Sequence, residues 1–154
     1  MDKKRLEEHI GHKVRIAHIA IDKYFSTCWK QVDIEPTRMQ CATMRYLRQH
    51  EGEDVFQKDL EEAFSITGAT VTNILKVMEK EGLLTRVPMP QDARLKKLEL
   101  TEKGYALDEN ARANVHRLEE GMKKGFTEEE LTTFRAYLDR VTQNIVDMVE
   151  ENTK

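Results

Sequence analysis

The sequence predicts a mainly α-helical fold that contains one small β-hairpin. Apolar residues recur at steps of three and four over most of the 154-residue chain, a period that is typical of amphipathic helices. The exception lies near residues 83–100, where two short apolar segments flank the proline-containing stretch 88–93, as in a hairpin. No run of about 18 apolar residues, which a transmembrane helix needs, is present, and the charged N-terminus lacks the apolar core of a signal peptide. We therefore expect a cytoplasmic protein.

The first expected helix is long and runs from about Leu6 to Cys28, because apolar residues line one of its faces at helical spacing. This helix must end before Pro36, since proline lacks an amide donor and biases its neighbour toward extended geometry. Pro36 suits the first turn of a second helix, which we expect to run to about His50.

The middle of the chain predicts two helices and then the hairpin. A short helix is expected at about 57–64, followed by a tight connection at 65–66 and a helix from Thr67 to Glu81. Gly82 is a natural end for that helix, because glycine enters the left-handed region without steric cost. Two strands follow near 83–87 and 95–100, joined by the loop 88–93.

Two further helices complete the chain, the first with Thr101 as its cap. The last helix has a clear start signal, because Thr127 and Glu130 have the spacing of a capping box. Its apolar residues then repeat at heptad spacing, which predicts a seam that contacts another helix. That partner is either a second chain or the helix at 105–124. The seam consists of Leu131, Phe134, Leu138, Val141, Ile145 and Met148.

The order helix, turn, helix, hairpin is that of a winged helix-turn-helix. The 67–81 helix would bury its apolar face and expose a side of small, hydroxyl, amide and cationic groups, which suits the DNA major groove. In the hairpin, Arg94, Lys96 and Lys97 bring three cations together. The arginine can enter a minor groove, and the lysines would lie along adjacent phosphates. The alternative interpretation is a solvated helix face and a charged turn beside an edge strand.

The middle of the chain resembles the MarR family of bacterial transcriptional regulators. The resemblance rests on Gln57-Lys58-Asp59-Leu60, on Ile66-Thr67 before Thr70-Val71-Thr72, on the stretch from Met78 to Arg86, and above all on the stretch from Asp92 to Gly104. That last stretch is similar to the family's wing signature, an Asp-x-Arg tip followed by a strand that ends in Leu-Thr-x-Lys-Gly. The chain departs from the usual pattern at Phe56, Glu61, Ser65 and Asn73.

The resemblance implies a homodimer that binds a pseudo-palindromic operator in double-stranded DNA, and we expect it to act as a repressor, although the sequence does not distinguish repression from activation. Residues 34–101 would form the winged helix-turn-helix domain, and 1–33 with 102–154 the helical dimerisation region. The 67–81 helix would enter the major groove, and the 88–95 wing, in which Asp92 orients Arg94, the minor groove. The recognition-helix candidates are Thr67, Ala69, Thr70, Thr72, Asn73 and Lys76.

Such regulators respond to a small aromatic or phenolic effector that binds between the dimerisation helices and the winged domain. His12, Arg15 and His18 share one face of the first helix and are candidates for lining that cleft, although such residues are more often solvated. The two cysteines, Cys28 and Cys41, are read as partly buried thiols rather than redox sensors.

We expect neither a catalytic residue, a cofactor nor a metal site, because the sequence shows no nucleophile–base pair, phosphate loop or metal motif. Residues 57–101 carry seven basic and seven acidic side chains, whereas 102–154 carry a charge of −4, which residues 1–56 reduce to the net −3 of the chain. This balance favours the rival function, a winged-helix protein-interaction module that does not bind DNA. Steep weakening of binding by salt would distinguish DNA binding from that alternative.

Overall fold

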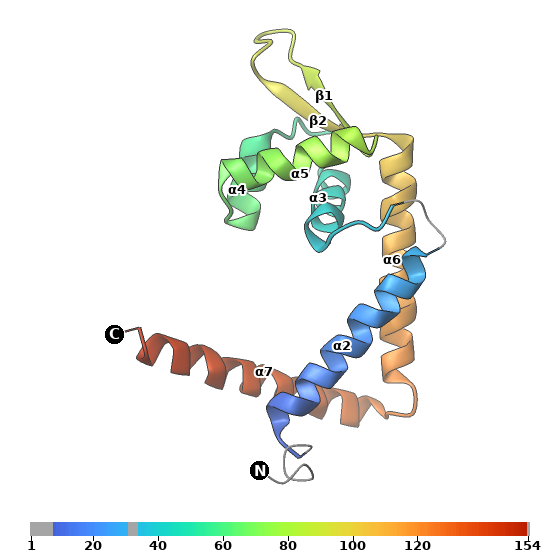
Figure 1. Ribbon diagram of the computed structural model, residues 1–154, viewed down its shortest axis with the longest axis vertical. Helices are drawn as coiled ribbons and strands as arrows, with labels where there is room; N and C mark the ends of the chain where they lie inside the picture. The colour runs from blue at the N-terminus through green and yellow to red at the C-terminus, as the bar shows by residue number, and fades with distance from the viewer. Residues whose placement is uncertain (1–7, 31–33, 154) are drawn as a thin grey trace. The chain divides into compact units, whose positions relative to one another are not determined.

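The computed structural model describes residues 8–30 and 34–153. The chain forms two compact units, residues 1–116 and 117–154, and helix α6 continues from the first into the second. The elements are α2 (Ile10–Trp29), α3 (Arg38–Gln49), α4 (Gln57–Phe64), α5 (Gly68–Lys80), β1 (Leu84–Pro88), β2 (Lys96–Leu100), α6 (Glu102–Lys123) and α7 (Glu128–Glu151) (Figure 1). The mainly helical fold with one hairpin is confirmed.

Most predicted boundaries are confirmed to within two residues, and α4 matches its predicted range. The first helix begins at Ile10, later than expected, and Leu6 lies outside the described residues. Pro36 does not begin the second helix. Thr37 is its N-cap instead, because the Thr37 hydroxyl accepts the Gln40 amide while the Gln40 side chain accepts the Thr37 amide, a complete capping box.

The core of the first unit lies between α3, α4, α5 and the hairpin. Met44, Leu60, Leu75 and Met78 are completely buried there. Trp29 from α2 and Leu107 and Ala111 from α6 extend the same cluster. The predicted apolar face of α5 is therefore confirmed as its buried face, and α5 is held by apolar packing against the rest of the unit.

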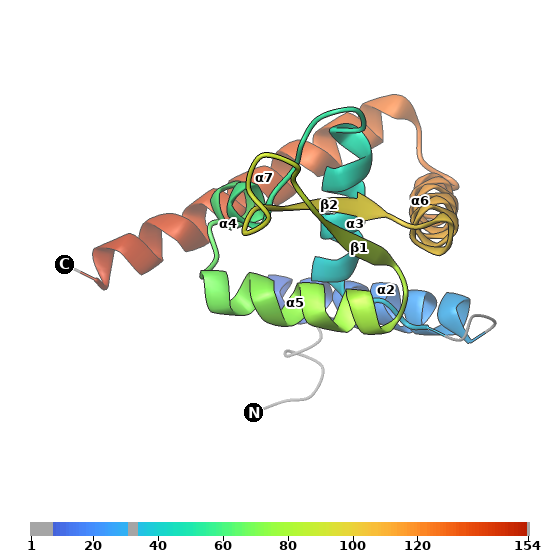
Figure 2. The same ribbon diagram turned by 90° about the horizontal axis from the view of Figure 1, so that it is seen from above.

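The two strands pair as an antiparallel hairpin in which Leu84 lies opposite Leu100 and Pro88 opposite Lys96. Pro88 is thus the last residue of β1 and not part of the loop, which is allowed because a terminal strand position needs no amide donor. The Leu98 amide donates to the Val55 carbonyl, so β2 is attached to the segment before α4. Figure 2 shows the hairpin beside α5.

Helix α5 ends in a Schellman motif. Gly82 has a φ of +71°, the Leu83 amide donates to the Met78 carbonyl, and the Gly82 amide donates to the Glu79 carbonyl. Leu83 and Met78 are both fully buried, as the hydrophobic contact of this motif requires. The predicted helix end at Gly82 is confirmed.

In the unit 117–154, the capping box of α7 is confirmed, since Thr127 and Glu130 each accept the other's amide hydrogen bond. The Phe126 ring stacks on Phe134 with 6.4 Å between ring centroids. Among the described residues, no helix is both long enough and apolar enough to cross a membrane.

Candidate nucleic-acid interface

The connection between α4 and α5 is tight because Ser65 adopts the left-handed conformation, with φ of 52°. In the described chain Ser65 is the only residue other than glycine with positive φ. This is the position at which the family usually has glycine. The serine therefore keeps the turn geometry at some cost in backbone strain, and the departure does not alter the path of the chain.

The start of α4 also keeps its geometry although Phe56 stands where a capping Ser or Thr is usual. Phe56 occupies the N-cap and has no side-chain acceptor, but its amide donates to the Asp59 carboxylate at 2.7 Å. Half of a capping box is therefore retained, and Asp59 also places a negative charge near the positive end of the helix dipole.

A polar cluster joins α4 to the first turns of α5. It includes Glu61, one of the positions at which the chain departs from the family pattern, which usually has a small residue there. The Gln57 amide donates to the Glu61 carboxylate at 2.9 Å, to the Gly68 carbonyl at 3.2 Å and to the Thr72 hydroxyl at 3.0 Å. A Cβ on Gly68 would lie 2.8 Å from Glu61 Oε1, so a side chain at this position would displace the Glu61 carboxylate from the cluster. No local pattern in the sequence indicates this role of Gln57, because its partners lie up to 15 residues away in the chain.

The face of α5 opposite the core is open. Five of the six recognition-helix candidates are exposed, namely Thr67, Ala69, Thr70, Asn73 and Lys76. Thr72 is only half-buried, and its hydroxyl is already bonded to Gln57. The hydroxyl of Thr67 caps the helix and also lies 2.9 Å from that of Thr70. The surface therefore offers hydroxyl, amide and ammonium groups without a covering side chain.

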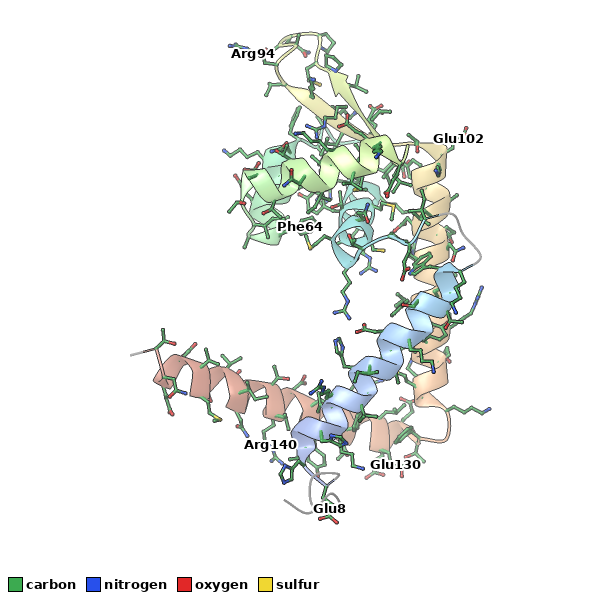
Figure 3. The ribbon with its side chains drawn as sticks, in the orientation of Figure 1. Glu8, Phe64, Arg94, Glu102, Glu130 and Arg140 are labelled. Atoms are coloured by element: carbon green, nitrogen blue, oxygen red, sulfur yellow. The ribbon has the colours of Figure 1, made fainter. Side chains whose placement is uncertain are left out.

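Arg94 lies at the outer end of the hairpin, as Figure 3 shows, and its side chain is 91% exposed. The Asp92 carboxylate accepts the Arg94 backbone amide at 2.9 Å and two guanidinium nitrogens at 3.2 and 3.3 Å. These bonds to Arg94 lower the pKa of Asp92, so the carboxylate stays charged. The expected orientation of Arg94 by Asp92 is present as a bidentate contact.

The two lysines after Arg94 differ in their surroundings. Lys96 is exposed and has no polar partner among the described residues. Lys97 is only 24% exposed and pairs with Asp54 at 3.0 Å and Glu99 at 3.5 Å. Asp54, and more weakly Glu99, raise the pKa of Lys97. The Lys97 ammonium is therefore used in ion pairs within the protein. Its pair with Asp54 attaches the hairpin to the segment before α4.

A cavity of about 490 Å³ opens between α2, α3 and α6 within the first unit. Its apolar wall is made by Phe25, Trp29, Pro36 and Val115, and its polar groups include Arg38 and Arg45. A cavity of this size and mixed lining is suited to a drug-sized molecule. Phe25 and Trp29 are not among the predicted site residues, because no local pattern marks them as lining a cavity.

None of His12, Arg15 and His18 lines this cavity. His12 is half-buried, Arg15 is exposed, and His18 Nε2 lies 3.3 Å from the Asp22 carboxylate. Asp22 does line the cavity and pairs with Arg38 at 2.6 Å, an ion pair that joins α2 to α3.

Cys41 also lines the cavity, whereas Cys28 does not. Burial raises the pKa of the Cys41 thiol, so it is less reactive than an exposed cysteine at neutral pH. Both thiols are unpaired and half-buried. Within residues 8–30 and 34–153, no three His, Cys, Asp or Glu side chains are grouped as a metal site requires.

The seam of α7 is largely uncovered in the single chain. Leu131 is buried, but Phe134, Leu138, Ile145 and Met148 are each 39–60% exposed, and Val141 is half-buried. Exposed apolar rows of this kind on one helix are characteristic of a surface that another helix covers.

Comparisons with known proteins agree with this geometry. The profile of the MarR family matches residues 34–95. The chain is 31% identical to the HTH-type transcriptional regulator YybA of Bacillus subtilis (strain 168) over 126 residues, which cover 82% of this chain and 81% of YybA.

Two solved structures are also similar over most of the chain. The heme sensor protein PefR from Streptococcus agalactiae, in complex with heme, has a TM-score of 0.76 and 30% identity, over 89% of this chain and 94% of PefR. The MepR–DNA complex of S. aureus has a TM-score of 0.68 and 28% identity, over 85% of this chain and 96% of MepR. These relatives are regulators and not enzymes. The chain therefore belongs to the MarR family and is a DNA-binding transcriptional regulator with a winged helix-turn-helix.

Proposed function

We propose that the protein is a ligand-responsive repressor that binds a pseudo-palindromic operator as a homodimer, with α5 in the major groove and the 88–95 wing in the minor groove. The observation that carries this proposal is the tip of the wing, where Asp92 holds an almost fully exposed Arg94 guanidinium. A preoriented cation on a narrow projection suits the minor groove, where the negative potential is enhanced. The similar structure of MepR was solved in complex with DNA, which supports DNA binding by a chain of this fold.

Different residues of α5 would contact the bases and the phosphates. Asn73 can pair with an adenine edge, and the small side chain of Ala69 permits close approach to the bases. Thr67, Thr70 and Lys76 reach the phosphate backbone or the base edges. Lys96 would contact phosphate directly, whereas Lys97 and Thr72, which already have partners in the protein, would act mainly by holding the wing and α5 in place.

Dimerisation would be provided by 1–33 and 102–154. The exposed apolar side chains of the α7 seam carry this part of the proposal, because an uncovered seam of this length is costly in water. Two copies related by a twofold axis would present two α5 helices to successive major grooves, which explains why the operator should be pseudo-palindromic.

The effector would occupy the cavity between α2, α3 and α6. Its aromatic wall of Phe25 and Trp29 favours an aromatic or phenolic ring, and Arg38 and Arg45 can hydrogen-bond to its polar groups. PefR, which is similar in structure, is a heme sensor, so sensing of an aromatic molecule is compatible with this fold. A regulator of this kind acts where the bacterial chromosome is, and we therefore place it in the cytoplasm.

Selection of bound sequences from a random duplex pool tests the proposal directly. We expect a recovered palindrome, and we expect its affinity to fall steeply as salt rises, since binding releases counterions from phosphates. Measuring affinity for the selected duplex and for a scrambled duplex at two salt concentrations separates sequence readout from charge. Failure to enrich any sequence, together with binding that does not respond to salt, would instead favour the protein-interaction module.

A further inference from the structure

The C-terminal end of α5 is held by side chains from two other helices. On one side, Gln40 from the first turn of α3 donates its side-chain amide to the Glu81 carboxylate at 2.9 Å. On the other, Lys103 Nζ donates to the Glu81 carbonyl at 2.9 Å and the Thr101 hydroxyl donates to the Gly82 carbonyl at 2.6 Å. Glu81 is the C-cap of α5, so both contacts act at the same helix end.

Both of these attachments begin at elements that line the cavity. Gln40 lies between Arg38 and Cys41, two lining residues of α3. Thr101 and Lys103 stand at the start of α6, whose Ala111 and Val115 line the cavity further along. The C-terminal end of α5 is therefore linked directly to two of the three helices that surround the cavity.

Gln40 is unusual because one carboxamide serves two purposes. Its oxygen accepts the Thr37 amide at 2.7 Å and thereby caps α3, while its nitrogen donates to Glu81. The residue is only 4% exposed, so both bonds are shielded from water and losing either would leave a buried polar group without a partner. A shift of the first turn of α3 must then either move the end of α5 or break this bond.

We propose that Gln40 is a positioning residue that couples occupancy of the cavity to the orientation of α5, through its hydrogen bond to Glu81. The inference rests on the proposed function, because it assigns the regulation of that cavity and of that DNA-binding helix. A ligand that displaces the segment around Arg38 and Cys41 changes the position of Gln40, and Glu81 transmits the change to α5. Coupling of this kind requires that the ligand binds the two orientations of α5 with different affinities.

The test fills the cavity covalently, so that it needs no knowledge of the natural effector. In protein carrying Cys28→Ser, Cys41 is the only thiol. Excess monobromobimane at alkaline pH, where more of this half-buried thiol is ionised, alkylates it with loss of bromide, and the Kd is measured only on protein that mass spectrometry shows to carry one label per chain. The measured quantity is the ratio of the Kd for the selected duplex after and before labelling. We expect a ratio of roughly five or more in the Cys28→Ser parent. The matched control is Cys41→Ser, in which only Cys28 can react, and treatment of this variant should leave the Kd unchanged.

Three variants then isolate the bond. Gln40→Glu keeps the α3 cap, since a carboxylate accepts the Thr37 amide equally well. It removes the donor to Glu81 and places a second carboxylate next to it, so the two groups repel each other. Glu81→Ala removes the acceptor without burying a charge. We expect the labelling ratio to fall toward one in both variants. In the double variant Gln40→Glu with Glu81→Gln, the bond is restored with its direction reversed, and the ratio should return to the parent value.

The outcomes are distinct. Ratios in Gln40→Glu and Glu81→Ala equal to that of the parent would overturn the role of Gln40, and so would a ratio of one in the parent itself. A double variant that stays uncoupled while its thermal midpoint matches the parent would also overturn it. If the parent binds no selected duplex at all, the proposed function fails instead.

Discussion

Gly104 packs against the backbone carbonyl of Leu83 so closely that a Cβ at this position would overlap the carbonyl oxygen. The contact joins the start of α6 to the residue that follows the end of α5. The same junction contains the Thr101 bonds to Gly82 and Leu83 and the Lys103 bond to Glu81. The Leu-Thr-x-Lys-Gly pattern at 100–104 thus has a structural reason, since it fastens the wing strand, α5 and α6 together.

Gly104→Ala should therefore destabilise the protein by about 1–3 kcal/mol, because backbone atoms must shift to admit one methyl group. Gly121→Ala on the same helix is the matched control. A Cβ there meets no atom within 4 Å, so alanine should stabilise the helix by about 0.5–1 kcal/mol through its higher helix propensity. Urea unfolding of both variants checks the prediction, which equal effects would contradict.

Arg94→Ala should weaken operator binding by about 1–3 kcal/mol, or roughly 5- to 150-fold in Kd, because it removes the cation that reads the minor groove. Asp92→Asn should cost less, since an amide oxygen can still accept from the Arg94 backbone. Gln91→Ala serves as the control in the same loop, because Gln91 is exposed. Fluorescence anisotropy with the selected duplex measures all three, and an Arg94→Ala protein that binds like Gln91→Ala would remove the wing from the mechanism.

Leu138→Asp should shift the protein from dimer to monomer, because it places a carboxylate in the middle of the apolar seam of α7. Ala136→Asp adds the same charge to the same helix at an exposed position outside the seam, and it should leave the dimer intact. Light scattering over a range of concentrations gives the molar mass of each. A parent protein that is monomeric at every concentration would show that the seam is not a dimer contact.

Glu130 should make the unfolding temperature depend on pH in acid. The Thr127 amide, and then its hydroxyl, donate to the Glu130 carboxylate and lower its pKa below the ordinary value. The folded state thus favours the charged form. Its contribution to stability is complete above the unfolded pKa, which is about 4.3, and is lost as pH falls through the lower folded pKa.

Glu130→Gln isolates this effect, since glutamine keeps the capping geometry without the charge. We expect the parent to melt above the variant at pH 7 and the difference in thermal midpoint to be smaller at pH 3. The same difference at both pH values would contradict the assignment of the effect to the charge of Glu130.

Local sequence signals predicted much of the fold, and they failed where two local signals compete for the same helix end. The Thr127–Glu130 capping box and Gly82 gave correct helix ends because each depends only on residues a few positions apart. The start of α3 was predicted two residues early, because Pro36 also fits a first turn and the competing box of Thr37 and Gln40 was overlooked. Ser65 shows that a turn can keep its geometry without the usual glycine.

The site was harder to predict where partners come from distant parts of the chain. The exposed face of α5 follows from helical period alone, and Asp92 lies two residues from Arg94. By contrast, Lys97 was expected to face phosphate, and its pairing with Asp54 depends on how the hairpin packs beside α4. The three hydrogen bonds of the Gln57 side chain and the cavity between α2, α3 and α6 likewise form only in the tertiary structure, so no local pattern predicts them. His12, Arg15 and His18 were candidates for such a cavity because they share a helix face, and the cavity lies elsewhere.

Trp29 is the only tryptophan of the chain, and it forms part of the wall of the cavity. Its indole is almost entirely shielded from water, so its emission reports the polarity of that one place in the molecule. A compound that binds in the cavity against the ring changes the surroundings of the indole, and a library can therefore be screened by intrinsic fluorescence with unmodified protein.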